Sequence, residues 1–495
     1  MAEGPGRGIA WAGAVNLVGG GLGSLIGLLL AAVVGRELGT EGAGTYFLVV
    51  AVFMIVSNVA ELGADTGLVR FVSAARATGR ESDVPHLLRA AVVPVLVTGV
   101  LVVAVTTVVA VTTDPFDGLS PGLVVAGAVL AVLSSLVAVT LAVTRGWGDV
   151  LAYPLLQNIA LPLLRLVGVV VVVAAGGGVV AVLTAWMAPV PVVLACAAGV
   201  AVLLTVRGAG SVRDRTMPRA ERRRLSRTFW AFSSTRGVSA AVEILLEWID
   251  VILVGALASP EEAGVYAVVT RCARAGEVIQ QAARIAVGPQ ISGALARGAL
   301  DEAREIYGLV TAAMIWLAWP FFILVAVFGD ALLSLFGEGF EDGAVSLATL
   351  SLAMGLATAA GTVQTILLMG GRSTWQLTDK SFALAVNVVL DLVLIPVWGI
   401  EGAAVAWAVT IVVDTAVVVY QVQRLMDVRP RLHHLAVAAV LSVGLVGTGA
   451  GVSRLLLGSS VPVLLGTLGA LAVAYLAASW PLRHRLGLTA LLAHR

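Results

Sequence analysis

The stretch Val100-Leu101-Val102-Val103-Ala104-Val105-Thr106-Thr107-Val108-Val109-Ala110-Val111 contains no charged residue. About fourteen runs of this kind follow one another along the 495 residues, and each extends to the roughly 20 residues needed to cross a bilayer. The chain is 59% hydrophobic and only 12% charged, with a mean hydropathy of +0.99. Because no soluble domain of this size has room to hide so many apolar side chains, we predict a polytopic membrane protein.

The apolar runs predict helices, since in hydrocarbon each backbone polar group must be satisfied within its own segment. A membrane barrel would instead show short strands of alternating polarity. We therefore expect an all-α polytopic membrane protein with about 14 transmembrane helices. The expected spans are 9–34, 44–62, 90–112, 121–144, 151–174, 178–204, 229–256, 263–284, 307–328, 344–369, 381–397, 402–422, 435–456 and 461–480.

The basic residues between these spans predict the orientation. If the N-terminus is cytoplasmic, nearly every inward connection is basic, with the densest cluster between Arg207 and Arg227. The outward connections carry mainly acids, such as Asp114, Glu261 and Glu341. This arrangement follows the positive-inside rule. It predicts a multi-pass protein of the cytoplasmic membrane with both termini in the cytoplasm.

Composition also bounds the function. The net charge is +1 and membrane topology explains the cluster from Arg207 to Arg227, so we expect no nucleic-acid partner. Cys196 and Cys272 lie inside predicted helices and imply no disulfide. The sequence has no nucleotide-binding loop, no spacing of His and Cys typical of a metal site, and no nucleophile elbow. We expect a protein that is not an enzyme and holds no metal or cofactor.

An internal repeat predicts two related lobes. The segment Val34–Tyr46, between the first two spans, aligns without gaps to Val254–Tyr266, between the seventh and eighth, and both share Val, Gly, Glu, Ala, Gly and Tyr. Six helices separate the copies, so the lobes are expected to be related by a pseudo-two-fold axis along the membrane normal. The predicted domains are an N-lobe (1–206), a basic cytoplasmic linker (207–228), a C-lobe (229–424), and two C-terminal helices with a cytoplasmic tail (425–495).

Charged residues inside the predicted spans mark candidate sites, because each costs roughly 2.5–3.5 kcal/mol at mid-bilayer on insertion scales. The seventh span carries Arg236, Glu243, Glu247 and Asp250 on one helical stripe, and the eighth carries Arg271, Arg274 and Glu277. These charges either form structural salt bridges between the two helices or line a hydrated cavity that binds an anion or relays an ion.

Three further intramembrane charges stand apart. Arg165 lies in the middle of the fifth span, where it either pairs with an acid on a neighbouring helix or makes bidentate contact with phosphate. Asp391 in the eleventh span and Asp414 in the twelfth are candidates for ion coupling or for structural pairing.

The chain resembles the polysaccharide-biosynthesis flippases of the multidrug/oligosaccharidyl-lipid/polysaccharide (MOP) exporter superfamily. The residues that carry the resemblance are Leu38-Gly39 with Gly42-Ala43-Gly44-Thr45-Tyr46, then Glu61-Leu62-Gly63-Ala64, Trp248–Gly255 and Ile395–Ala406. The resemblance implies translocation of a polyprenyl-diphosphate-linked oligosaccharide, a surface polysaccharide repeat unit, from the cytoplasmic to the outer leaflet. It implies alternating access around a central cationic cavity.

From their depth and helix position, the residues expected to bind the anionic headgroup are Arg165, Arg236, Arg271 and Arg274, and those expected to serve coupling or gating are Glu243, Glu247, Asp250, Asp391 and Asp414. The coupling ion, Na⁺ or H⁺, is left open. The implied partners are the lipid-linked glycan, membrane lipids, and glycosyltransferases or a polymerase of the same pathway.

Three alternatives stay open at this stage. A lipid II flippase of the same superfamily also has fourteen helices by this resemblance. An ion-coupled multidrug exporter is supported by Glu243, Glu247 and Asp250 but typically stops at twelve helices. A membrane glycosyltransferase or ligase is disfavoured because the predicted outer loops are too short for a catalytic domain.

Overall fold

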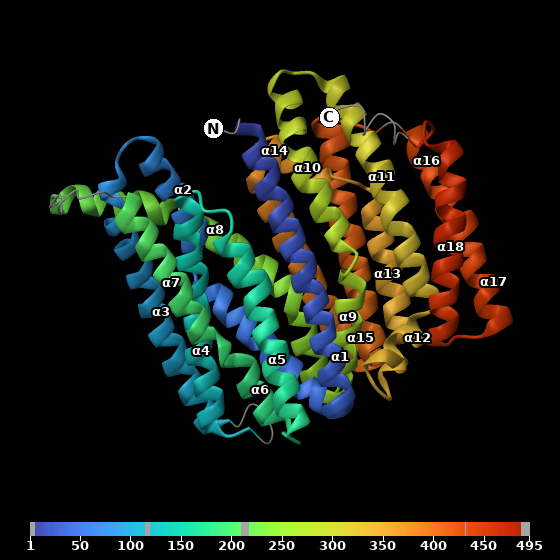
Figure 1. Cartoon of the computed structure of the whole chain (residues 1–495), viewed down its shortest axis with the longest axis horizontal. Coiled ribbons are helices and arrows are strands. Elements are labelled where there is room, and N and C mark those ends of the chain that lie inside the picture. The colour runs from blue at the N-terminus through green and yellow to red at the C-terminus, as the bar shows by residue number, and fades with distance from the viewer. Residues whose placement is uncertain (1–4, 114–118, 209–216, 431, 487–495) are drawn as a thin grey trace. The chain divides into compact units, whose positions relative to one another are not determined.

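A computed structural model describes residues 5–113, 119–208, 217–430 and 432–486, and every regular element in these ranges is a helix (Figure 1). In a segment exposed to lipid, the backbone N–H and C=O groups can form their hydrogen bonds only within the segment itself, as a helix does. The first half of the chain forms α1 (Pro5–Ala60), α2 (Ala64–Ala77), η1 (Glu81–Asp83), α3 (Val84–Thr112), α4 (Pro121–Gly146), η2 (Pro154–Ala160), α5 (Leu161–Ala174), α6 (Val179–Met187), α7 (Pro189–Gly208) and α8 (Arg219–Leu257).

The second half continues with α9 (Pro260–Arg274), α10 (Glu277–Ala296), α11 (Leu300–Val327), α12 (Gly329–Leu333), η3 (Ser334–Phe336), η4 (Phe340–Gly343), α13 (Ala344–Ala359), α14 (Val363–Met369), α15 (Ser373–Tyr420), η5 (Gln421–Leu425), α16 (Leu432–Leu441), η6 (Ser442–Gly447), α17 (Thr448–Leu457) and α18 (Val461–Leu482). The elements η2, η5 and η6 are π-helical, and the other η elements are 3₁₀ turns.

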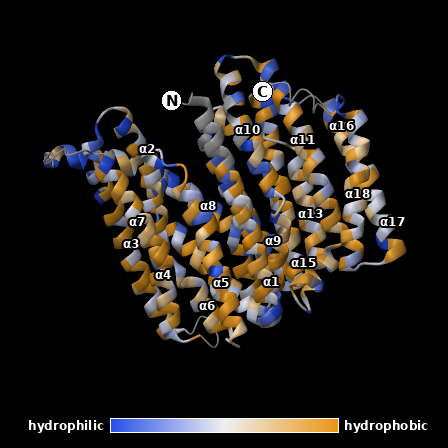
Figure 2. Ribbon diagram, in the orientation of Figure 1, coloured by the Kyte–Doolittle hydropathy of each residue, from blue (hydrophilic) through white to orange (hydrophobic). Residues whose placement is uncertain are grey.

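Within the described ranges, 10 helical stretches are long and apolar enough to span a membrane. Figure 2 shows hydrophobic residues along most of their length. Two of the stretches contain an interior break: α1 bends at Gly39 and α15 at Gly399, where the backbone has a positive φ. Each break falls between two predicted spans. The all-helical membrane fold is therefore confirmed, whereas the count of fourteen spans stays a prediction because α8, α9 and α10 are not among the ten.

The chain forms two compact units. The first contains residues 1–30 and 45–249, and the second contains residues 31–44 and 250–495. Helices α1 and α8 therefore contribute to both units. The predicted domain limits at residues 206, 228 and 424 stay predictions.

The core of the first unit brings α2, α3, α4 and α8 together. Leu68, Leu87, Val139 and Phe229 lie in one buried cluster, with exposed fractions of 1% or less. Close backbone packing supports it, since a Cβ atom on Gly63 would overlap the Ser233 carbonyl. Gly63 also has φ +73°, so glycine satisfies both the left-handed backbone and the contact.

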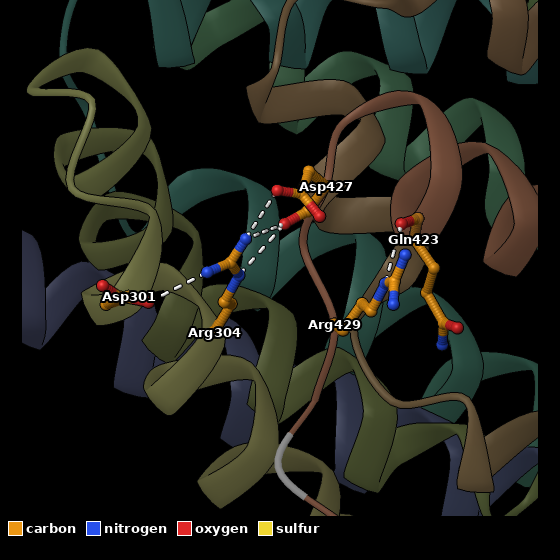
Figure 3. Close-up of polar contacts among 5 residues, drawn as sticks. All are labelled: Asp301, Arg304, Gln423, Asp427 and Arg429. Atoms are coloured by element: carbon orange, nitrogen blue, oxygen red, sulfur yellow. Dashed lines mark hydrogen bonds and ion pairs between the residues drawn. The ribbon is translucent and has the colours of Figure 1, made fainter.

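In the second unit, α11 and α13 pack side by side, and α16 and α18 pack against α11 (Figure 1). The Trp316 ring stacks on Tyr475 with centroids 6.0 Å apart, and the Trp316 indole donates to Ser479 Oγ at 2.8 Å. The connection before α16 is held by Arg304, which contacts Asp301 and both the carbonyl and carboxylate of Asp427 (Figure 3). The two C-terminal spans are thus fixed to the body of this unit.

The repeated glycines have a packing role in the second unit. Residues 31–44 belong to this unit, and there Gly44 lies against the Pro260 carbonyl while Gly264 lies against Gly44. A Cβ atom on either glycine would overlap backbone atoms of the other segment. Arg36 Nε adds a bond of 2.7 Å to the Leu335 carbonyl. Both copies of the repeat therefore need glycine for close contact between segments.

Candidate functional site

The first polar site is built around Arg165 on α5. Its guanidinium carbon lies 3.8 Å from the centre of the Trp186 ring, and its Nε donates to the Trp186 carbonyl at 3.2 Å. Trp186 is itself held edge-on by Phe53 and Tyr46, with centroids at 5.0 and 6.2 Å. Aromatic packing therefore fixes the orientation of this cation.

Arg165 has no carboxylate partner among the described residues; its contacts are with Trp186. The terminal nitrogens Nη1 and Nη2 make no hydrogen bond in this part of the chain. They are the planar pair that binds a phosphate or carboxylate in a bidentate fashion. Two roles are expected for Arg165: pairing with an acid or contact with phosphate. The described residues offer no acid for the first role.

The predicted stripe on α8 is divided between the two units. Arg236 and Glu243 belong to the first unit, where Arg236 is half-buried and Glu243 is exposed. Within the described ranges, neither side chain has an ion-pair partner. Glu247, also in the first unit, is exposed as well. The ladder of salt bridges from this stripe to α9 stays a prediction, since Arg236 and Glu243 belong to the first unit and α9 to the second.

The second polar site lies in the second unit, where α8, α9 and α15 contribute to it. Asp250, at the C-terminal part of α8, is 3% exposed, and its Oδ2 accepts a hydrogen bond of 3.1 Å from the Tyr266 hydroxyl. Arg274 on α9 is an electrostatic neighbour of Asp250, and its guanidinium carbon lies 5.8 Å from the centre of the Trp407 ring. Arg271, one turn earlier on α9, donates to the Ala267 carbonyl at 2.8 Å.

A second carboxylate lies next to Asp250. Asp391 and Asn387, one turn apart on α15, are both fully buried and adjoin Asp250. Both Asp391 oxygens, both Asn387 amide atoms and Asp250 Oδ1 lack a hydrogen bond of ordinary geometry. Two anionic carboxylates at such close range in a medium of low dielectric constant repel strongly. A shared proton or a bound cation would relieve this repulsion, which Arg274 partly offsets.

Asp414, the last predicted site residue, lies in a different cluster. Its Oδ2 accepts from Lys380 Nζ at 2.7 Å and from Gln364 Nε2 at 3.2 Å. This ion pair joins the two halves of α15 across the break at Gly399. Structural pairing therefore accounts for Asp414 at least in part.

Sequence reasoning missed three contributors to these sites: Trp186, Tyr266 as a donor, and Asn387. Asn387 had a usable signal, since it precedes Asp391 by one helical turn in an otherwise apolar run. Trp186 had none, because nothing in the sequence pairs it with Arg165.

A helical membrane protein whose described residues include a buried arginine without a carboxylate partner in one unit and adjoining buried carboxylates in the other has the make-up of a polytopic transporter. The chain belongs to the polysaccharide biosynthesis protein family, whose profile matches residues 10–294. It is also similar to a Haloferax volcanii protein described as probable low-salt glycan biosynthesis flippase Agl15, with 22% identity over 230 residues. That match covers 45% of this chain and 47% of the relative, so the chain spans about half the length of the relative it matches.

Solved structures share the fold. A structure of the lipid II flippase MurJ in an inward closed conformation has a TM-score of 0.67 at 9% identity, covering 93% of this chain and 98% of that one. An inward-facing multidrug resistance MATE family transporter of the MOP superfamily has a TM-score of 0.62 at 16% identity, covering 82% and 96%. The fold is therefore that of the MOP superfamily, as the sequence resemblance predicts.

Proposed function

We propose that this protein is a flippase that moves a polyprenyl-diphosphate-linked oligosaccharide from the cytoplasmic to the outer leaflet by alternating access. The observation that carries the proposal is Arg165, a membrane-embedded guanidinium oriented by Trp186 with its terminal nitrogens left for an anionic ligand. A permanent charge at this depth is costly unless it serves a ligand. A diphosphate is such a ligand, and family membership supports a glycan attached to it.

Four arginines are proposed to contact the headgroup: Arg165 and Arg236 in the first unit, and Arg271 and Arg274 in the second. Arg165 and Arg236 have no acid partner in the described ranges, so they are proposed to make the stronger contacts. Arg274 adjoins Asp250, which lowers its net attraction for an anion. Its occupancy by substrate is therefore proposed to depend on whether the acid pair holds a cation.

The acid pair Asp250–Asp391 is proposed to be the coupling site, with Na⁺ or H⁺ as the ion. A bound cation neutralises the repulsion between the carboxylates and is released when the site opens to the other side. Glu243, Glu247 and Asp414 are proposed to act in gating. The protein is proposed to need no cofactor and to catalyse no bond change.

We place the protein in the cytoplasmic membrane with both termini cytoplasmic, because the basic residues of the predicted inner connections support that orientation. The proposed partners are lipids and the glycosyltransferases or polymerase that make and use the glycan. A lipid II flippase is the nearest alternative. An ion-coupled drug exporter is the second candidate, favoured by the buried pair Asp250–Asp391 alone.

Mass spectrometry of lipids that copurify with the full-length protein tests the substrate class. Wild type is compared with Arg165→Ala and Arg271→Ala, and with Arg424→Ala as an exposed control outside the site. A polyprenyl-diphosphate glycan retained by wild type and Arg424→Ala but depleted in Arg165→Ala is the expected result. The same glycolipid retained by all four proteins contradicts the assigned site. Phospholipids alone in wild type, together with drug efflux driven by a cation gradient, favour the exporter instead.

A further inference from the structure

A second polar cluster surrounds the buried Asp379 of α15, twelve residues before Asp391, with contributions from α14 and η5, and the proposed function leaves most of it unexplained. We call it the Asp379 cluster; it consists of Gln364, Asp379, Lys380, Asp414 and Gln421. Asp379 Oδ1 accepts a hydrogen bond of 2.9 Å from Gln421 Nε2 in the π-helical turn η5. Asp414 is an electrostatic neighbour of Asp379, as is Lys380.

The Asp379 cluster carries more negative than positive charge. Two carboxylates face one ammonium group, so the cluster has a net charge of −1 when all three are ionised. Asp379 is only 8% exposed, and its Oδ2 has no hydrogen-bond partner. Asp414 Oδ1, Gln364 Oε1 and Gln421 Oε1 are also buried without a partner. Four buried oxygens without donors are the environment that a cation or a proton satisfies.

A salt bridge between the halves of α15 explains only part of this cluster. Lys380 and Asp414 suffice for such a bridge, since their charges cancel at 2.7 Å. Asp379 adds a second acid with no ion-pair partner among the described residues, and burying an uncompensated carboxylate costs several kcal/mol. A purely structural role would be better served by an apolar residue at this position.

The ridge of α15 links this cluster to the acid pair. Asp379, Ala383, Asn387 and Asp391 follow one another at intervals of four residues, and all four are at most 8% exposed. Such residues form a single ridge on a helix. At about 1.5 Å per residue, Asp379 lies about 18 Å along the helix from Asp391, and the fully buried Asn387 lies one turn from Asp391 on the side toward Asp379.

We propose that Asp379, supported by Gln421 and Asp414, is a second cation station through which the coupling cation reaches or leaves the Asp250–Asp391 pair along this ridge of α15. The inference rests on the proposed cation coupling. Lys380 forms an ion pair with Asp414, so Asp379 is the acid of the cluster that is proposed to receive the cation. Asn387, which adjoins Asp250, extends the polar surface of the pair by one helical turn toward Asp379, and its side-chain amide has both donor and acceptor capacity.

The test measures cation exchange by the full-length protein in liposomes. Radioactive sodium reports Na⁺ exchange, and an enclosed pH-sensitive dye reports proton exchange, so the two arms also identify the ion. Asp379→Asn is compared with Asp391→Asn and with Glu401→Gln, which removes an exposed acid from the same helix. Asp391→Asn is expected to abolish cation binding. Asp379→Asn is expected to keep equilibrium binding but to slow exchange by about tenfold, since the path loses its charged group.

Two results overturn the inference, and they are distinguishable. If wild type exchanges neither ion, the coupling proposal fails and the second station fails with it. If wild type and Asp391→Asn behave as expected while Asp379→Asn exchanges at the wild-type rate, only the second station fails. A lowered Tm of Asp379→Asn with unchanged exchange likewise assigns Asp379 to structure.

Gln421→Leu guards against a folding failure of Asp379→Asn. It removes the hydrogen bond to Asp379 and leaves the carboxylate in place. Exchange is expected to slow by about fivefold, the effect of losing one positioning hydrogen bond. Wild-type exchange by this variant overturns the proposal independently.

Discussion

The charged side chains of Arg165 and Asp250 are both buried, but the groups that surround them differ in charge. Among the described residues Arg165 has aromatic rings and a backbone carbonyl for neighbours but no acid, so the charge is oriented without being neutralised. Asp250 lies among a hydroxyl, an amide, a second carboxylate and Arg274, so two carboxylates face one guanidinium and the group carries an excess of negative charge when all three are ionised. The first arrangement attracts an anion, and the second attracts a cation. A coupled transporter needs both.

Loss of the Asp391 carboxylate should have the largest effect on transport. Asp391→Asn leaves Asp250 as a single acid near Arg274, so the pair no longer binds a cation. We expect gradient-driven transport to fall by about a hundredfold and to lose its dependence on Na⁺ or pH. Transport by reconstituted protein with and without an ion gradient measures the effect. Full cation dependence in a folded Asp391→Asn protein would show that the pair is not the coupling site.

Loss of the Arg165 guanidinium should have the second-largest effect. Arg165→Ala removes charge-assisted hydrogen bonds to the substrate, which corresponds to about a thirtyfold loss of affinity. Arg165→Lys keeps the charge but not the planar fork, and should lose about tenfold. Retention of the copurified glycolipid measures both. Equal retention by the Lys and wild-type proteins would point to simple charge attraction instead of bidentate binding.

The aromatic support of Arg165 should contribute less than the guanidinium itself. Trp186→Leu removes the ring at 3.8 Å but keeps an apolar side chain, so Arg165 stays charged and loses its orientation. A cation–π contact of about 1 kcal/mol predicts about a fivefold loss of substrate retention. Val182→Leu, at a buried apolar position of the same helix α6, is the control for changed packing. A loss in the control as large as that in Trp186→Leu would assign the effect to packing.

The smallest effect should come from the donor to Asp250. Tyr266→Phe removes one hydroxyl and its bond of 3.1 Å, while the ring that packs in α9 remains. One such hydrogen bond contributes about 1 kcal/mol, so we expect a change of about fivefold or less in cation affinity with little change in Tm. Titration of cation-dependent transport measures it. Complete loss of coupling would make Tyr266 an essential part of the site.

Much of the fold follows from the sequence because hydrocarbon allows few solutions. A run such as Val100–Val111 must be helical, and the glycines at 39 and 399 fall between predicted spans, where α1 and α15 do break. The direct connection of two spans through a sharp bend at each of these glycines was not predictable, since hydropathy does not specify how consecutive helices are joined. The repeated glycines were visible in the sequence, but their mutual contact in the second unit was not.

The sequence predicted the sites only as a set of charged residues whose transfer into the membrane costs free energy. The cost of burying a charge pointed to Arg165, Asp250 and Asp391, because a charge within the membrane needs a partner or a ligand to offset that cost. The pairing of Asp250 with Asp391 was not predictable, since the two acids are 141 positions apart in the sequence and each could have faced any of several helices. Uncharged contributors such as Asn387 and Trp186 carry too little transfer cost to stand out.

Transfer of a labelled polyprenyl-diphosphate oligosaccharide across the membrane of reconstituted liposomes tests the central claim most directly. Wild type, Arg165→Ala and protein-free liposomes are compared under an imposed Na⁺ or pH gradient. We predict that wild type moves the glycolipid to the opposite leaflet, that a gradient accelerates the movement, and that Arg165→Ala does neither. Movement no faster with folded wild-type protein than in protein-free liposomes would contradict the claim.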